Sequence, residues 1–106
     1  MILQSVLDDI LEFRRERDWE QFHTPKNLAI SVSVEAGELL ELFQWQEFAS
    51  ISEISKEVAD VFIYLLLLCH DLGIDPLESI RYKMKENREK YPVSKCKGKS
   101  DKWTKY

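Results

Sequence analysis

The chain has 106 residues, which is enough for one compact domain with a modest hydrophobic core. Its 44% hydrophobic and 32% charged residues are ordinary for a soluble globular protein, and three Gly and three Pro are too few for an all-β fold rich in tight turns. The net charge of −4 argues against general nucleic-acid binding, although a metal ion could bridge an acidic protein to the phosphates of a nucleotide.

Apolar residues recur at three- and four-residue spacing from Ile2 to about Arg17, which predicts an amphipathic first helix. The other face of this helix carries Glu and Arg side chains and is expected to be solvated. The segment does not combine a basic start with a following apolar run, as a signal peptide does. Since the two cysteines of the chain also form no recognisable disulfide pattern, we expect a cytoplasmic protein.

A loop with two aromatic side chains and a histidine follows the first helix. It contains Trp19, Phe22 and His23, and it ends at Thr24 and Pro25, a favourable N-cap and first residue for a second helix. From residue types alone, we expect Trp19 and Phe22 to seal one end of a helical bundle. The alternative is that they line a pocket for a nucleobase.

The second helix is predicted over about residues 25–45 and has an acid within its apolar stripe. The stripe consists of Leu28, Val32, Glu35, Leu39 and Leu42. Glu35 is therefore expected to face the core, Glu38 to flank the stripe and Glu41 to lie on the surface. Gly37 costs a helix about 1 kcal/mol relative to Ala, and it suits a place where a backbone or a ligand comes close.

The third helix is predicted to follow the connector Gln46–Ile51 and to end at Leu72. Ser50 and Glu53 form a possible capping box at its start, and Gly73 is its C-terminal cap. Its predicted core stripe is Ile54, Val58, Val61, Leu65, Leu68 and Leu72. Beside that stripe lie Glu57, Asp60 and Tyr64.

This third helix is apolar nearly all round from Val61 to Cys69, which is typical of a helix surrounded by protein. In so small a domain, the additional apolar face predicts a subunit interface. The run Val58–Cys69 is too short to cross a bilayer, which takes about 20 residues, so we expect no membrane association. Cys69 and Cys96 form no metal or disulfide pattern, and His70 is expected to meet the helix dipole without a catalytic role.

Asp75, Pro76 and Glu78 predict the start of a fourth helix, which Pro92 ends. Its predicted inward stripe is Leu77, Ile80, Met84, Asn87 and Tyr91. One face of this helix carries Lys83, Asn87 and Lys90. That face is either a solvated basic surface or a set of donors to phosphate groups.

Residues 93–106 carry an excess of Lys and show no periodicity, so we expect a basic, mobile C-terminal tail after a domain of residues 1–92. Trp103 and Tyr106 in this tail either pack on a neighbouring subunit or have no structural role. The predicted fold class is all-α, a four-helix bundle-like subunit that assembles into an oligomer.

Two acidic pairs, Glu35-x-x-Glu38 and Glu57-x-x-Asp60, lie in the two most apolar segments of the chain. Residues three apart on a helix share one face, so each pair projects two carboxylates in nearly one direction. Carboxylates are rarely buried without a partner. The pattern predicts a divalent metal ion between the two helices, and oxygen-only ligands favour Mg²⁺ or Mn²⁺ over Zn²⁺.

Such a site would support metal-assisted hydrolysis of a nucleotide phosphoanhydride. Glu38 is the predicted general base because it flanks the stripe on which Glu35 lies. Lys83 and Lys90 would offset phosphate charge, and Asn87 would orient the phosphate chain. The sequence has no Walker A loop.

The same residues resemble the signature of the all-α nucleoside triphosphate pyrophosphohydrolases, the MazG-like superfamily. The closer similarity is to its dCTP pyrophosphatase branch and spans most of the chain from Arg17 to Pro92. Besides the acidic pairs, it is carried by Arg17–His23, Gly37–Leu39, Glu41–Trp45, Asp60–Val61, Ile63–Leu65, Lys83–Met84, Asn87 and Tyr91–Pro92.

This resemblance implies cleavage of a nucleoside triphosphate, dCTP or a modified pyrimidine nucleotide, to a monophosphate and pyrophosphate. It implies subunits that build sites at the interfaces of a homodimer or homotetramer. The implied ligands of Mg²⁺ are Glu35, Glu38, Glu57 and Asp60, with Glu38 and Glu35 catalytic. The implied substrate contacts are Trp19 and Trp45 on either side of the base, with His23, Tyr64, Lys83, Asn87, Lys90 and Tyr91, and with Lys26 and Asn27 nearby.

Two departures from the animal dCTP enzymes bear on the preference for cytosine. The connector Gln46–Ile51 is shorter, and Ile10 stands where a polar residue able to reach a base is expected. A dUTPase-like or phosphoribosyl-ATP pyrophosphohydrolase-like activity is therefore an alternative. A further alternative is a non-catalytic helical interaction module whose acids pair with lysines of a partner subunit.

Overall fold

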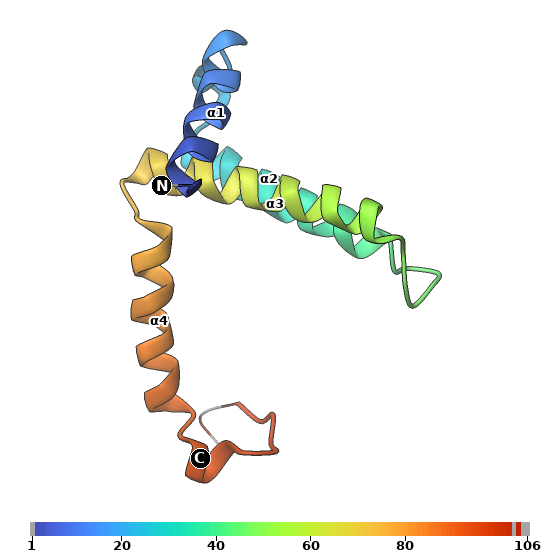
Figure 1. The fold of residues 1–106 in the computed structure, drawn as a ribbon, viewed down its shortest axis with the longest axis vertical. Coiled ribbons are helices and arrows are strands. Elements are labelled where there is room, and N and C mark those ends of the chain that lie inside the picture. Colours follow the sequence, from blue (N-terminus) through green and yellow to red (C-terminus); the bar gives the residue numbers. More distant parts are fainter. Residues whose placement is uncertain (1, 103, 105–106) are drawn as a thin grey trace. The chain divides into compact units, whose positions relative to one another are not determined.

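The computed structural model describes residues 2–102 and 104, which contain helices and no strand. This confirms the all-α class (Figure 1). The elements in chain order are α1 (Ile2–Glu16), the 3₁₀ turn η1 (Glu20–Phe22), α2 (Pro25–Glu41), α3 (Ile51–Leu72), α4 (Pro76–Lys90) and α5 (Val93–Cys96). Among the described residues, no helix is both long and apolar enough to span a membrane.

The chain divides into two compact units, Met1–Ile74 and Asp75–Tyr106. In the first unit, α2 and α3 lie side by side along most of their length, and α1 contacts α3 (Figure 1). The buried core of this unit is small. It consists of Leu28, Ala49 and Leu67, together with the side chain of Arg14.

The helix starts are fixed by the side chains that the sequence predicts. Thr24 Oγ1 accepts a hydrogen bond from the backbone N–H of Asn27 at 3.1 Å, and Ser50 Oγ accepts one from Glu53 at 3.1 Å. Asp75 Oδ1 accepts from the first turn of α4. Gly73 ends α3 in the left-handed region, at φ 69°, which only Gly adopts without strain.

The C-terminus of α2 differs from the prediction, because the helix ends at Glu41 and not near Trp45. The backbone N–H groups of residues 42–44 bond to carbonyls three residues back, at 2.9 to 3.3 Å, so the chain tightens out of the α-helix. Gln46 Nε2 donates to the carbonyl of Leu42 at 2.8 Å and so satisfies one of the last acceptors. Trp45 lies beyond the helix and is 90% exposed.

The predicted core stripe of α3 is partly wrong. Leu65 and Leu72 are 38% and 51% exposed, whereas Leu67 is 3% exposed. The packed face of α3 is therefore rotated toward Leu67, and Tyr64 and Asp60, one and two turns before it, lie on that face rather than beside it. This rotation aims the acids of α3 at α2.

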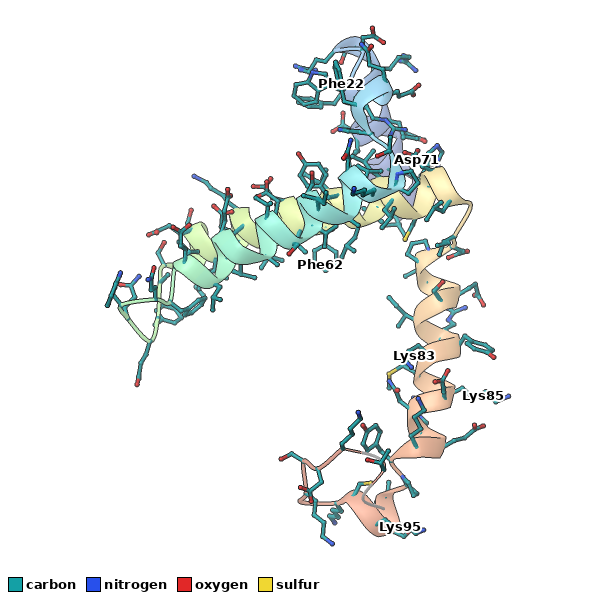
Figure 2. The ribbon with its side chains drawn as sticks, turned by 180° about the vertical axis from the view of Figure 1, so that it is seen from behind. Phe22, Phe62, Asp71, Lys83, Lys85 and Lys95 are labelled. Carbon is teal, nitrogen blue, oxygen red and sulfur yellow. The ribbon has the colours of Figure 1, made fainter. Side chains whose placement is uncertain are left out.

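Several large apolar side chains of the first unit are exposed to solvent in the single chain. Ile30, Val34 and Phe62 are 50%, 53% and 59% exposed, and Phe62 projects from the face of α3 that turns away from α1 (Figure 2). In a single chain, α3 is thus not surrounded on all sides as its composition predicts. The expected subunit interface stays a prediction.

In the second unit, α4 ends at Lys90, and the N–H of Tyr91 bonds to the carbonyl of Asn87 at 2.8 Å, before Pro92. The predicted tail begins with the single turn of α5, Val93–Cys96. Trp103 and Tyr106 lie outside the described residues, and the mobility of the tail stays a prediction.

Candidate active site

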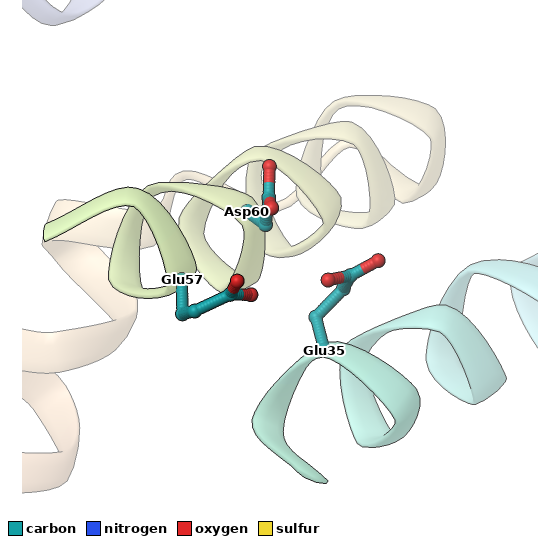
Figure 3. Close-up of side chains that lie close together, drawn as sticks. All are labelled: Glu35, Glu57 and Asp60. Atoms are coloured by element: carbon teal, nitrogen blue, oxygen red, sulfur yellow. The ribbon is translucent and has the colours of Figure 1, made fainter. Parts of the chain in front are cut away.

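Three of the four predicted metal ligands come together between α2 and α3. Glu35, Glu57 and Asp60 each place a carboxylate oxygen within 4.8 Å of the others (Figure 3). Glu35 comes from α2, and Glu57 and Asp60 come from consecutive turns of α3. The i, i+3 spacing that marked these residues in the sequence is what aligns the two acids of α3.

The fourth predicted ligand, Glu38, flanks this group. Its side chain is more exposed than that of Glu35, and together with Glu57 it lines an open cavity of about 510 Å³ at the C-terminal end of α2. Trp45 and Glu41 line the same cavity. The surface position predicted for Glu41 holds, but this residue also borders the acidic cluster.

The electrostatics of the cluster are those of like charges held together. The pKa of Glu35 is raised first by burial, then by hydrogen bonding to the Glu38 carboxyl and by the charges of Glu38, Asp60 and Glu57. Burial and the charges of Glu38 and Asp60 likewise raise the pKa of Glu57. The pKa of Tyr64 is raised by burial and then by the nearby acids.

The residues of the cluster fit a hard divalent cation. Glu35 Oε2 and Glu57 Oε2 are buried without a hydrogen-bond partner, which is uncommon for polar atoms. Within the part of the chain that the structure describes, no Lys or Arg forms an ion pair with the four predicted ligands. The donors are all carboxylate oxygens, which Mg²⁺, Mn²⁺ and Ca²⁺ prefer.

A second, smaller cavity of about 50 Å³ lies between α1, α3 and the loop that joins α1 to α2. Its wall includes Phe13, Arg14, Trp19, His23 and Tyr64. The rings of His23 and Tyr64 meet edge to face, with centroids 6.4 Å apart. Since Tyr64 lies one helical turn from Asp60, this cavity is next to the acidic cluster.

The position of Trp19 is set by the turn that ends α1. The N–H of Asp18 bonds to the carbonyl of Arg15 at 3.0 Å, and the N–H of Trp19 bonds to that of Arg14 at 3.1 Å. Asp18 has φ 54°, which completes the Schellman motif. The ring of Trp19 then packs against Phe13 with a centroid distance of 5.7 Å, the apolar contact that accompanies this motif.

The expectation that Trp19 and Phe22 seal the bundle is wrong for Phe22, which is 61% exposed and projects outward (Figure 2). Trp19 lines the smaller cavity but is itself 42% exposed. Trp19 and Trp45 line different cavities of the chain. Asn27 donates to the carbonyl of Phe22 at 3.0 Å and steadies the loop, whereas Lys26 is exposed.

The predicted substrate contacts Lys83, Asn87, Lys90 and Tyr91 all belong to the second unit. Lys83 Nζ and Lys90 Nζ lie 3.0 and 2.9 Å from the same atom, Glu86 Oε1, so Glu86 neutralises part of the predicted basic face. The role of these four residues stays a prediction.

Sequence reasoning missed the pair formed by Arg14 and Asp71. Arg14 Nη1 and Nη2 donate to Asp71 Oδ2 and Oδ1 at 2.8 and 2.9 Å, across 57 residues of sequence. Figure 2 shows Asp71 near the C-terminal end of α3, where α3 lies beside α1. The one available signal was the register of Arg14, four residues after Ile10 on the apolar side of the first helix.

Known proteins are similar to this chain in sequence and in fold. The profile of the MazG-like family matches residues 30–105. The rat protein dCTP pyrophosphatase 1 is 38% identical over 115 residues, which cover 95% of this chain and 68% of the rat protein. Its human counterpart is 38% identical over 118 residues, with the same coverage. The crystal structure of a pyrophosphatase from Archaeoglobus fulgidus superposes with a TM-score of 0.82 at 44% identity, covering 87% of this chain and 94% of that one.

Proposed function

The chain belongs to the MazG-like family, and from this premise we propose that it is a nucleotide pyrophosphohydrolase that cleaves a nucleoside triphosphate to a monophosphate and pyrophosphate. The names of its relatives support this activity. The observation that carries the proposal is the group formed by Glu35, Glu57 and Asp60, because two of its buried carboxylate oxygens have no partner.

Glu35, Glu57 and Asp60 would hold a divalent cation, with Glu38 as a further ligand or at the edge of the group. We propose Mg²⁺, with Mn²⁺ as a substitute, because all the donors are oxygens. When bound, the cation would offset the charge of the triphosphate and of the carboxylates themselves. The described residues form helices and no strand, and the sequence has no glycine-rich phosphate loop, so a bound cation would supply contacts that such a loop makes to a polyphosphate in other folds.

The hydrolytic step uses water as the nucleophile. A bond forms between the water oxygen and a phosphorus of the bridge between the α- and β-phosphates, the bridging P–O bond breaks, and its electrons leave with one phosphate product. We propose that Glu38 acts as the general base and accepts a proton from the water. Of the two acids on α2, Glu35 and Glu38, it is the more exposed, and it lines the larger cavity.

The base would occupy the smaller cavity beside Trp19, His23 and Tyr64, and the preferred substrate would be dCTP or a modified pyrimidine deoxynucleotide. Trp45 lines the larger cavity of the same chain and would contribute to a base pocket from a second copy. The exposed apolar residues Ile30, Val34 and Phe62 support a homodimer or homotetramer. Light scattering coupled to gel filtration measures that state.

The experiment that tests the activity measures pyrophosphate and monophosphate release from a panel of dNTPs and NTPs, with Mg²⁺ and with EDTA. Mg²⁺-dependent release from dCTP, with little release from purines, is the expected result. Inorganic pyrophosphate as a separate substrate distinguishes a nucleotide enzyme from an inorganic pyrophosphatase. Preferred cleavage of dUTP would keep the proposed reaction but make dUTP, in place of dCTP, the preferred substrate. If the folded protein releases pyrophosphate from no nucleotide, the proposal is overturned.

A further inference from the structure

Arg14 is a charged residue in the interior of the first unit. It is 4% exposed, and both of its Nη atoms are engaged by one carboxylate, that of Asp71. The Asp71 side chain is itself 22% exposed, and Glu20 approaches Arg14 Nη2 only to 3.8 Å. A buried ion pair of this kind adds little net stability compared with apolar packing, so its presence in α1 and α3 calls for another explanation.

Two nitrogen atoms beside this pair are buried and have no hydrogen-bond partner. They are Arg14 Nε and His23 Nδ1. Both residues line the same cavity, together with the flat side chains of Phe13, Trp19 and Tyr64. Buried polar atoms are usually satisfied, and two unsatisfied donors or acceptors at one aromatic cavity indicate that a ligand completes their hydrogen bonds.

We propose that Arg14 and Asp71 are positioning residues for base recognition: their ion pair fixes the polar part of the cavity wall beside His23, and the imidazole of His23 exchanges a hydrogen bond with an uncharged planar heterocycle. The proposal rests on the nucleotide pyrophosphohydrolase activity proposed above. It assigns a role to two residues that do not themselves touch the phosphates or the acidic cluster.

The charges around His23 support this assignment. Burial lowers the pKa of His23, the charge of Arg14 lowers it further, and the charge of Asp71 raises it. Three groups thus act on the imidazole. The guanidinium of Arg14 comes from α1, and the phenol ring of Tyr64 and the carboxylate of Asp71 come from α3. A neutral imidazole has one N–H donor and one acceptor nitrogen, whereas an imidazolium has donors only.

The cavity also suits an uncharged ring. Because Asp71 engages both Nη atoms of Arg14, the guanidinium charge is balanced before any ligand enters. The aromatic walls stack on flat π-systems without regard to charge. A heterocycle that must be protonated or deprotonated to bind would meet a wall with no uncompensated charge.

The first test is a pH titration of the two histidine rings by NMR, in the full chain without nucleotide. His70→Gln assigns the signals. We expect Arg14→Met to raise the pKa of His23, since Asp71 then acts alone, and Asp71→Asn to lower it, since Arg14 then acts alone. Arg14→Lys keeps the positive charge and should titrate close to wild type. Shifts of the same sign in Arg14→Met and Asp71→Asn would overturn the proposal, because a merely structural role loosens the cavity in both.

The second test compares nucleotide selectivity in the double variant Arg14→Met/Asp71→Asn, which has no unpaired charge, with a matched control at an exposed acid of α1, Glu12→Gln. We expect KM for the preferred nucleotide to rise about tenfold, which corresponds to the loss of roughly one hydrogen bond. The difference in KM between nucleotides with different bases should become smaller, and kcat should change less than KM. An equal fall in kcat for every nucleotide would overturn the proposal. The wild-type panel tests the activity itself, so the two failures are distinguishable.

Discussion

The two ends of the site on α3 handle charge in opposite ways. At one end, Glu35, Glu57 and Asp60 collect like charges and have no cationic side chain to balance them among the described residues. At the other end, Arg14 and Asp71 balance each other through two short hydrogen bonds. The first end therefore needs a ligand to become stable, whereas the second is preorganised in the free protein.

Helix α3 can carry both the acidic cluster and the balanced ion pair because the two lie against different helices. The acids of α3 are aimed at α2, and Asp71, three turns further on, is aimed at α1. A cluster of repelling groups stores unfavourable free energy that a cation releases on binding. A balanced pair stores none, but removing one of its two partners leaves the other charge uncompensated and should destabilise the protein. Substitutions at the two ends should accordingly have opposite effects on stability.

The largest effect is expected from neutralising the acidic end. Glu35→Gln and Asp60→Asn should lower turnover at saturating Mg²⁺ by at least about 10³-fold, since each removes a ligand from the group. Without metal, the same variants should be as stable as wild type or more stable, because they relieve repulsion. Pyrophosphate release and urea unfolding in EDTA measure the two quantities. Near-normal turnover in either variant would show that the metal assignment is wrong.

Breaking the balanced end should cost stability. Arg14→Met leaves the Asp71 carboxylate without its partner in a partly buried position, and we expect a loss of up to about 3 kcal/mol in the free energy of unfolding. The double variant with Asp71→Asn should recover much of this loss. Urea unfolding of the four proteins of the cycle measures the coupling. A double variant as unstable as the sum of the single ones would contradict a direct pair.

Metal binding should stabilise the acidic end alone. With Mg²⁺ at about 100 times its dissociation constant, we expect a gain of about 2.7 kcal/mol in unfolding free energy. The gain should disappear in Glu57→Gln and persist in Arg14→Lys. Thermal unfolding with and without Mg²⁺ checks this, and an equal gain in Glu57→Gln would place the cation elsewhere.

The smallest effect is the dependence of the metal-free protein on pH. The folded pKa values of Glu35 and Glu57 are raised above the ordinary value of 4.5, so the folded state binds more protons than the unfolded state just above that pH. Stability should therefore fall as the pH rises through this window. The pKa of His23 is lowered below 6.5, so stability should also fall as the pH drops below 6.5. Unfolding in EDTA from pH 4 to 8, with Glu35→Gln as the control, measures both slopes.

Local features of the chain were predictable from the sequence almost residue by residue. Thr24, Ser50, Gly73 and Asp75 cap the helices where their residue types predict, because a cap involves only neighbours in sequence. The grouping of Glu35, Glu57 and Asp60 was also predictable, since helical spacing fixes which acids share a face.

Features that depend on contacts between distant segments were not predictable. Arg14 looks like part of a solvated face until Asp71 is brought to it by the packing of α1 on α3. The exposure of Leu65 and Leu72 depends on a rotation of α3 that periodicity alone does not determine, because this helix is apolar on several sides. The early end of α2 was missed for a local reason, because apolar periodicity gives no sign of the bond from Gln46 to the carbonyl of Leu42.

The turn that ends α1 separates the shape of the smaller cavity from its chemistry. Trp19 is held there by a bond between backbone groups, from its own N–H to the carbonyl of Arg14. Any L-residue at position 14 supplies that carbonyl, so exchanges at positions 14 and 71 can alter the polarity of the wall while the aromatic ring keeps its place. If the proposed base pocket is correct, exchanges at these two positions should change the preference among bases while Trp19 stays in place.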